Sequence, residues 1–142
     1  MILRDTEKGG DEEVSKRILV VESERGMREL ISTYLMRAGY EVVGADNGTR
    51  ALELTGVNQS DLIVLAVMLD GDMDGFEVLQ SLQANPATAD IPVIVLTAKA
   101  QDADIFRGWQ SGISAYLVKP FSPRELLTFI ERIFRSMNER LT

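Results

Sequence analysis

The sequence has 142 residues, is 45% hydrophobic and has no cysteine, which is typical of one domain that buries a core without disulfides. Its formal net charge of −7 argues against binding to nucleic acid or to an anionic membrane, because phosphate groups are held by clustered Lys and Arg. No apolar stretch approaches the ~20 residues of a membrane span, and the mostly polar start excludes a signal peptide. We therefore expect a cytoplasmic protein whose partner is another protein.

Composition divides the chain into three parts. Residues 1–15 are rich in Asp and Glu with little periodic apolar content, and we expect a flexible acidic leader without a fold of its own. Residues 16–137 carry the periodic patterns of one folded domain, and residues 138–142 are expected to form a polar tail.

Strands are predicted wherever Val, Ile and Leu form short continuous runs, since such runs are typical of strands buried on both faces of a parallel sheet. The predicted strands are residues 17–21, 41–45, 61–65, 92–96 and 116–118.

Helices are predicted between these runs, where apolar residues recur on one face at the helical spacing. The first follows Glu24 and is stopped by Gly39, and the last is capped by Ser122 with Pro123 in its first position. The others are expected over residues 49–55, 75–83 and 102–111.

Five strands alternating with five helices predict a doubly wound parallel α/β sheet with helices on both faces. The strand order 2-1-3-4-5 of flavodoxin-like folds is one of the two common solutions, and it places the ligand site at the carboxyl ends of the strands, between the first and third. The residues expected there are one carboxylate, two hydroxyls, one ammonium and one methyl group: Glu22, Ser23, Thr97, Lys119 and Ala66.

Five motifs in the same order resemble the receiver domain of two-component response regulators. They are ILVV (18–21), DLIVL (61–65), MDGF (73–76), VLTA (95–98) and YLVKPF (116–121), and the resemblance covers roughly residues 16–134. It implies a (βα)5 receiver fold in which an aspartate ending the third strand takes a phosphoryl group from a histidine kinase. It further implies an acid pair that holds Mg²⁺, a Thr and a Lys that bind phosphoryl oxygens, a switching aromatic residue, and a cis peptide at Lys119-Pro120.

Position by position, the resemblance is incomplete. Thr97, Lys119 and the aromatic Tyr116 are present, but the acid pair is Glu22-Ser23 and the nucleophile position is Ala66. An acyl phosphate requires a carboxylate nucleophile, and Mg²⁺ is usually held through one or two carboxylates plus phosphate. The joint loss of both sites favours natural divergence over a laboratory alanine substitution.

Each remaining pocket residue also has a structural interpretation, which we favour. Lys119 is expected to pair with Glu22 across the strand ends. The Thr97 hydroxyl is expected to bond to backbone, and Tyr116 to be a half-buried aromatic residue.

The loop after the third predicted strand contains Asp70, Asp72 and Asp74 in the spacing of the first half of an EF-hand calcium loop. The position of the closing bidentate Glu is Ser81, and a strand precedes the loop instead of a helix. A solvated acidic loop is therefore favoured over a calcium site.

The sequence as a whole predicts a pseudo-receiver: a non-enzymatic signalling domain without a cofactor, not phosphorylated on aspartate, that acts by protein–protein contact. A homodimer through the fourth helix, fifth strand and fifth helix is the contact that the resemblance implies. The alternatives are a phosphorelay regulator with an unconventional acceptor and, with less support, a calcium-binding module.

Overall fold

The computed structural model describes residues 15–99 and 113–141 of the chain. They form a five-stranded parallel sheet in the order β2-β1-β3-β4-β5, which confirms the predicted topology. Its strands are β1 (Arg17–Val21), β2 (Glu41–Ala45), β3 (Leu62–Ala66), β4 (Val93–Thr97) and β5 (Ile113–Val118).

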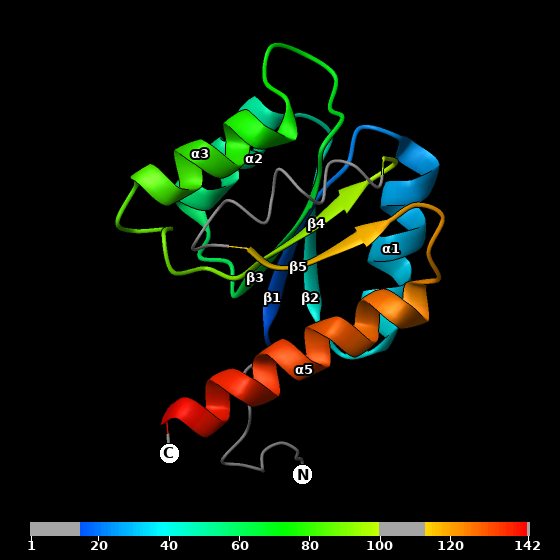
Figure 1. Ribbon diagram of the computed structural model, residues 1–142, viewed down its shortest axis with the longest axis vertical. Coiled ribbons are helices and arrows are strands. Elements are labelled where there is room, and N and C mark those ends of the chain that lie inside the picture. Colours follow the sequence, from blue (N-terminus) through cyan, green and yellow to red (C-terminus); the bar gives the residue numbers. More distant parts are fainter. Residues whose placement is uncertain (1–14, 100–112, 142) are drawn as a thin grey trace, which may run out of the picture.

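Helices cover both faces of this sheet. Those in the described residues are α1 (Arg25–Arg37), α2 (Gly48–Val57), α3 (Gly75–Ala84) and α5 (Pro123–Leu141). Helices α1 and α5 lie on one face, and α2 and α3 lie side by side on the other (Figure 1). The helix predicted over residues 102–111 and most of the predicted acidic leader lie outside the described residues.

The core consists of two apolar layers, one on each face of the sheet. Alternation along each strand assigns its side chains to the layers: Ile18 and Val20 of β1 pack with α1 and α5, whereas Leu19 and Val21 pack with α2 and α3. Strands β3 and β4 are buried along their whole length. Burial on both faces explains why these strands are continuous apolar runs.

Hydrogen bonds confirm the predicted end of α1 and the predicted start of α5. Gly39 follows α1 with φ of 103°, a conformation that favours glycine, and Tyr40 N donates to Leu35 O at 3.2 Å to close the helix end. At the start of α5, Ser122 Oγ accepts a hydrogen bond from Glu125 N at 3.1 Å, with Pro123 as the first helical residue.

Several element boundaries differ from the predicted ones, and β3 and β4 each lie one residue later than predicted. Helix α2 begins at Gly48 because the Asn47 side chain caps it, accepting from Arg50 N at 2.8 Å. Strand β5 begins at Ile113, since its pairing with β4 extends past its apolar run. Helix α5 continues to Leu141, so residues 138–141, which we assigned to a polar tail, are helical.

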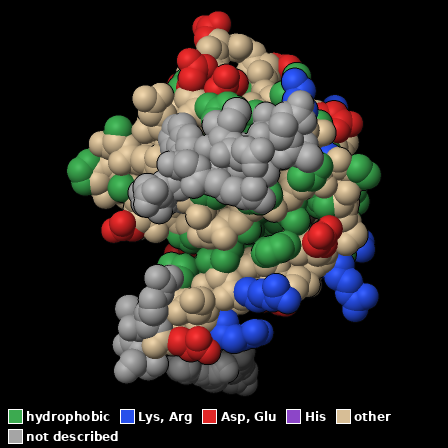
Figure 2. Space-filling model, viewed as in Figure 1, with side chains coloured by type: hydrophobic (Ala, Val, Ile, Leu, Met, Phe, Trp, Pro, Cys, Tyr) green, Lys and Arg blue, Asp and Glu red, His purple; other side chains and the backbone are tan. Residues whose placement is uncertain are grey.

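Charge is unevenly distributed over the surface. Figure 2 shows basic side chains along α5, where Arg124, Arg132 and Arg135 are exposed, and acidic side chains at the end where the loop between β3 and α3 lies. Within the described ranges, no helix combines the length and the apolar character that crossing a bilayer requires.

Candidate functional site

The predicted pocket residues lie at the carboxyl edge of the sheet. Ala66 and Thr97 end β3 and β4, while Glu22 and Lys119 directly follow β1 and β5. The chain passes from Lys119 into a cis peptide bond with Pro120, as the family resemblance implied. Parallel strands alone therefore bring together residues far apart in the sequence.

Glu22 and Lys119 form a partly buried ion pair at the centre of this edge. Lys119 Nζ lies 2.7 Å from Glu22 Oε1, with only 3% of the Glu22 side chain and 25% of the Lys119 side chain exposed. The other carboxylate oxygen, Oε2, accepts from Glu24 N at 3.1 Å, and Lys119 N donates to Thr97 O at 2.7 Å. The predicted pairing is confirmed, and both Glu22 oxygens are engaged.

The hydroxyl of Ser23 joins three loops. It donates to Asp46 O, in the loop after β2, and accepts from Asp70 N, in the loop after β3, both at 2.7 Å. A parallel bridge between Asn47 and Asp70 holds the same two loops together. Ser23 thus provides a neutral link between these loops.

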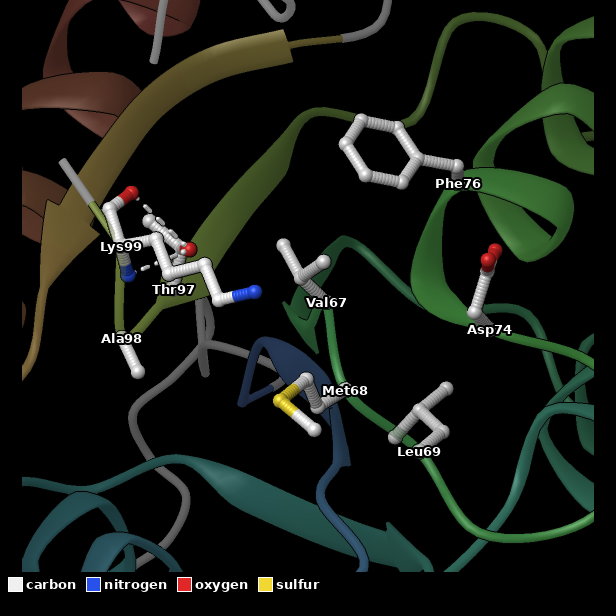
Figure 3. Close-up of a pocket in the computed structure, with 8 residues that line it drawn as sticks. All are labelled: Val67, Met68, Leu69, Asp74, Phe76, Thr97, Ala98 and Lys99. Atoms are coloured by element: carbon white, nitrogen blue, oxygen red, sulfur yellow. Dashed lines mark hydrogen bonds between the residues drawn. The ribbon is translucent and has the colours of Figure 1, made fainter. Parts of the chain in front are cut away.

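Thr97 is buried, and its hydroxyl is directed to backbone, as predicted. Thr97 Oγ1 accepts from Lys99 N at 3.1 Å and donates to Lys99 O at 3.3 Å (Figure 3). Tyr116 is half-buried and packs against the core layer beneath α2 and α3.

Ala66 is 1% exposed and its surroundings are tightly packed. Gly75, the first residue of α3, packs against the Ala66 carbonyl oxygen so closely that a Cβ at residue 75 would collide with it. Gly75 N donates to Val67 O at 2.7 Å, which fixes the chain as it leaves β3. The residue ending β3 therefore presents only a methyl group and backbone.

The acidic loop is organised around the start of α3. Asp74 Oδ1 accepts from Glu77 N and Glu77 Oε1 accepts from Asp74 N, both at 2.9 Å, which completes a capping box. Among residues 15–99 and 113–141, no three Asp, Glu, His or Cys side chains lie together so that they could hold a metal ion. Asp74 therefore has a structural role as the helix cap.

Arg28 is a site residue that the sequence did not reveal. From the first turns of α1, its Nη1 donates to Glu22 O at 2.8 Å and lies 3.4 Å from Ser23 O. An Arg on a helix surface is ordinarily solvated, and no spacing rule singles out this one. The contact of Arg28 with the backbone after β1 depends on the rotation of α1 about its axis and on its position relative to β1.

A cavity of about 280 Å³ adjoins the edge on the side of β4. Thr97 is the one predicted pocket residue among its described lining residues. Glu22, Ser23 and Lys119 do not belong to that lining, so the cavity is a separate feature of the edge.

Comparison with known proteins gives a consistent result. A family model described as response regulator receiver domain matches residues 18–131. The chain is 39% identical over 122 residues to the phosphate regulon transcriptional regulatory protein PhoB of Pseudomonas aeruginosa, covering 86% of this chain and 53% of that protein. The chain thus spans about half the length of this curated relative.

Solved structures extend the similarity to three dimensions. The chemotaxis response regulator CheY4 of Vibrio cholerae superposes with a TM-score of 0.77 at 29% identity, covering 84% of this chain and 99% of that one. The receiver domain of the sensor histidine kinase PA1611 from Pseudomonas aeruginosa, with a magnesium ion in its active site cleft, gives 0.74 at 28% identity, covering 84% and 97%.

Proposed function

The chain belongs to the response regulator receiver domain family, and from this premise we propose that it is a pseudo-receiver that is not phosphorylated on aspartate. The observation that carries the proposal is Ala66, which ends β3 where the family resemblance implies the phosphoacceptor. A methyl group has no lone pair with which to attack phosphorus, whereas an acyl phosphate requires a carboxylate. Signalling then depends on protein contacts made by a fixed conformation.

The neighbouring residues support the same proposal, because they do not fit a magnesium ion. Mg²⁺ is usually held by one or two carboxylates plus phosphate oxygens. Glu22 directly follows β1 at this edge, and Lys119 already neutralises its carboxylate at 2.7 Å. The Ser23 hydroxyl is also committed, to Asp46 O and Asp70 N. We therefore assign the domain no metal cofactor.

Incubation with acetyl phosphate and Mg²⁺ should leave the intact mass of the protein unchanged. The reason is that Ala66 offers no nucleophile. Mass spectrometry of the whole chain would detect an added phosphoryl group directly. The control is an active receiver treated in parallel, which should gain one phosphoryl group. A stoichiometric, hydroxylamine-labile adduct would contradict the proposal. A hydroxylamine-stable adduct on another side chain would instead support a phosphorelay regulator with an unconventional acceptor.

Millimolar Mg²⁺ should shift the melting temperature little. A ligand stabilises a fold only through binding to its native state. Here the Lys119 ammonium group occupies the position beside Glu22 where a metal ion would bind. Differential scanning fluorimetry across a Mg²⁺ series, with matched ionic strength from NaCl as the control, measures the effect. A saturable rise in melting temperature with Mg²⁺ alone would show that other carboxylates have formed a site.

The partner in this proposal is another protein, with neither nucleic acid nor membrane as a target, and the location is cytoplasmic. The net charge of −7 supports a protein partner, since a negative charge disfavours binding to phosphate-rich surfaces.

A homodimer would use β5, α5 and the segment between β4 and β5. Strand β5 exposes 37% of Val118 at its end, and Arg132 of α5 lies 5.9 Å over the Phe129 ring. The domain has no catalytic role of its own.

A further inference from the structure

The cavity beside β4 has an apolar base that the backbone holds in place. Val67 N donates to Leu96 O at 2.9 Å, and Val67 O accepts from Gly75 N at 2.7 Å, so its position is fixed by both β4 and α3. Met68 and Leu69 continue the base, and Phe76 of α3 directs its ring toward the cavity (Figure 3). A pocket with such a base exists before any ligand arrives, which lowers the cost of binding.

Two opposite charges face each other across this base. Lys99 extends from the end of β4 with its ammonium group over the cavity, and Asp74 stands on the far side (Figure 3). Within the described part of the chain, no carboxylate forms an ion pair with Lys99. Asp74, by contrast, already uses Oδ1 to cap α3. The available charge is therefore positive and lies at one end of the cavity.

We propose that this cavity binds a small organic carboxylate with an aromatic or branched apolar body. The carboxylate would pair with Lys99, while the body would pack on Val67, Met68 and Phe76. Asp74 would repel the carboxylate from the other end and so set the orientation. Neither Ala66 nor the Glu22–Lys119 pair takes part, so the site does not depend on whether the domain is a pseudo-receiver.

The shape and chemistry of the cavity favour this ligand class over others. Its volume of about 280 Å³ lies just below the range of about 300–1,000 Å³ for small-molecule sites, which fits a single ring or a branched chain. An inorganic phosphate would leave the apolar base unused and would place a dianion near Asp74. The exposed Met68, with a flexible and polarisable side chain, suits contact with a ring.

The test uses 4-fluorophenylacetate as the probe, with binding followed by fluorine NMR. The unmodified protein should show saturable binding at one site, and the neutral 4-fluorophenylacetamide should bind about tenfold more weakly, because a charge-assisted bond is lost. Inorganic phosphate at the same concentration should not displace the probe.

Two variants locate the binding. Lys99→Gln should weaken 4-fluorophenylacetate about tenfold and remove its advantage over the amide. Ala98→Phe, at an exposed position in the lining, should fill the cavity and block both compounds. Lys16→Gln is the matched control: it removes a lysine at the other end of the sheet, where Nζ lies 5.6 Å over the Phe134 ring, and should leave binding unchanged.

The proposal would be overturned if binding of 4-fluorophenylacetate to the unmodified protein did not saturate below about 10 mM, because a weaker Kd would not indicate a specific site. Equal binding to Lys99→Gln and to the unmodified protein would also overturn it, as would displacement of the probe by phosphate. Melting temperatures of both cavity variants close to that of the unmodified protein would show that any loss of binding is local.

Discussion

Lys119→Met is expected to lower the free energy of unfolding by about 3 kcal/mol, near the lower end of the cost of removing one partner from a buried ion pair. The variant keeps an apolar stem of similar length but leaves the Glu22 carboxylate, 3% exposed, without its cation. The Lys119 side chain is 25% exposed, so water can solvate the Glu22 carboxylate where the ammonium group was. The loss of unfolding free energy is therefore expected at the lower end of the range for buried pairs. Urea denaturation followed by circular dichroism measures the change.

A second variant separates the charge from the packing. Glu22→Gln combined with Lys119→Met removes both charges and should recover more than half of the lost stability, because no uncompensated carboxylate remains. Arg25→Met is the control, since it breaks the exposed pair with Glu29 at 2.9 Å and should change stability little. A double variant as unstable as Lys119→Met alone would show that the ion pair is not what Lys119 contributes.

Ala66→Asp combined with Ser23→Asp is expected to turn an unreactive protein into one that acetyl phosphate modifies. The first substitution supplies the nucleophile and the second a metal carboxylate beside Glu22, and phosphoryl transfer depends on charge neutralisation and positioning. Ala66→Asp alone should react poorly. Intact-mass spectrometry with Mg²⁺ present measures the extent of reaction over time.

The structure also predicts what the double variant loses. Ser23→Asp removes the hydroxyl that links Asp46 O to Asp70 N, and the new carboxylates crowd Glu22. The metal-free double variant should therefore melt below the unmodified protein, and Mg²⁺ should restore much of the difference.

Two controls accompany this experiment. Ala66→Asn with Ser23→Asp has almost the same shape but no nucleophile, and should remain unmodified. Ser23→Ala should lower the melting temperature without any Mg²⁺ response, because it removes the link without adding charge. If Ala66→Asp alone reacts as fast as the double variant, Ser23 is not a second defect of the pocket.

The sequence by itself determined the sheet and the set of residues along its carboxyl edge. Apolar runs at residues 17–21 and 41–45 coincide with β1 and β2, and their alternation with helices predicts a parallel sheet covered on both faces. Alternation leaves two common strand orders open, and the family resemblance favours the observed one. Since parallel strands end at a common edge, the residues after each run had to meet. The pairing of Glu22 with Lys119 followed from charge alone, because opposite charges at a buried edge are stable only when paired.

Only the tertiary structure decided how the loops at that edge are joined. The bonds of Ser23 to the backbone of residues 46 and 70, and of Arg28 to Glu22 O, depend on the paths of loops and on the rotation of α1. Hydrophobic periodicity encodes which face of an element is buried, but it does not encode where a loop passes. The cavity that Lys99 overlooks arises in the same way, from the spacing between the end of β4 and the start of α3.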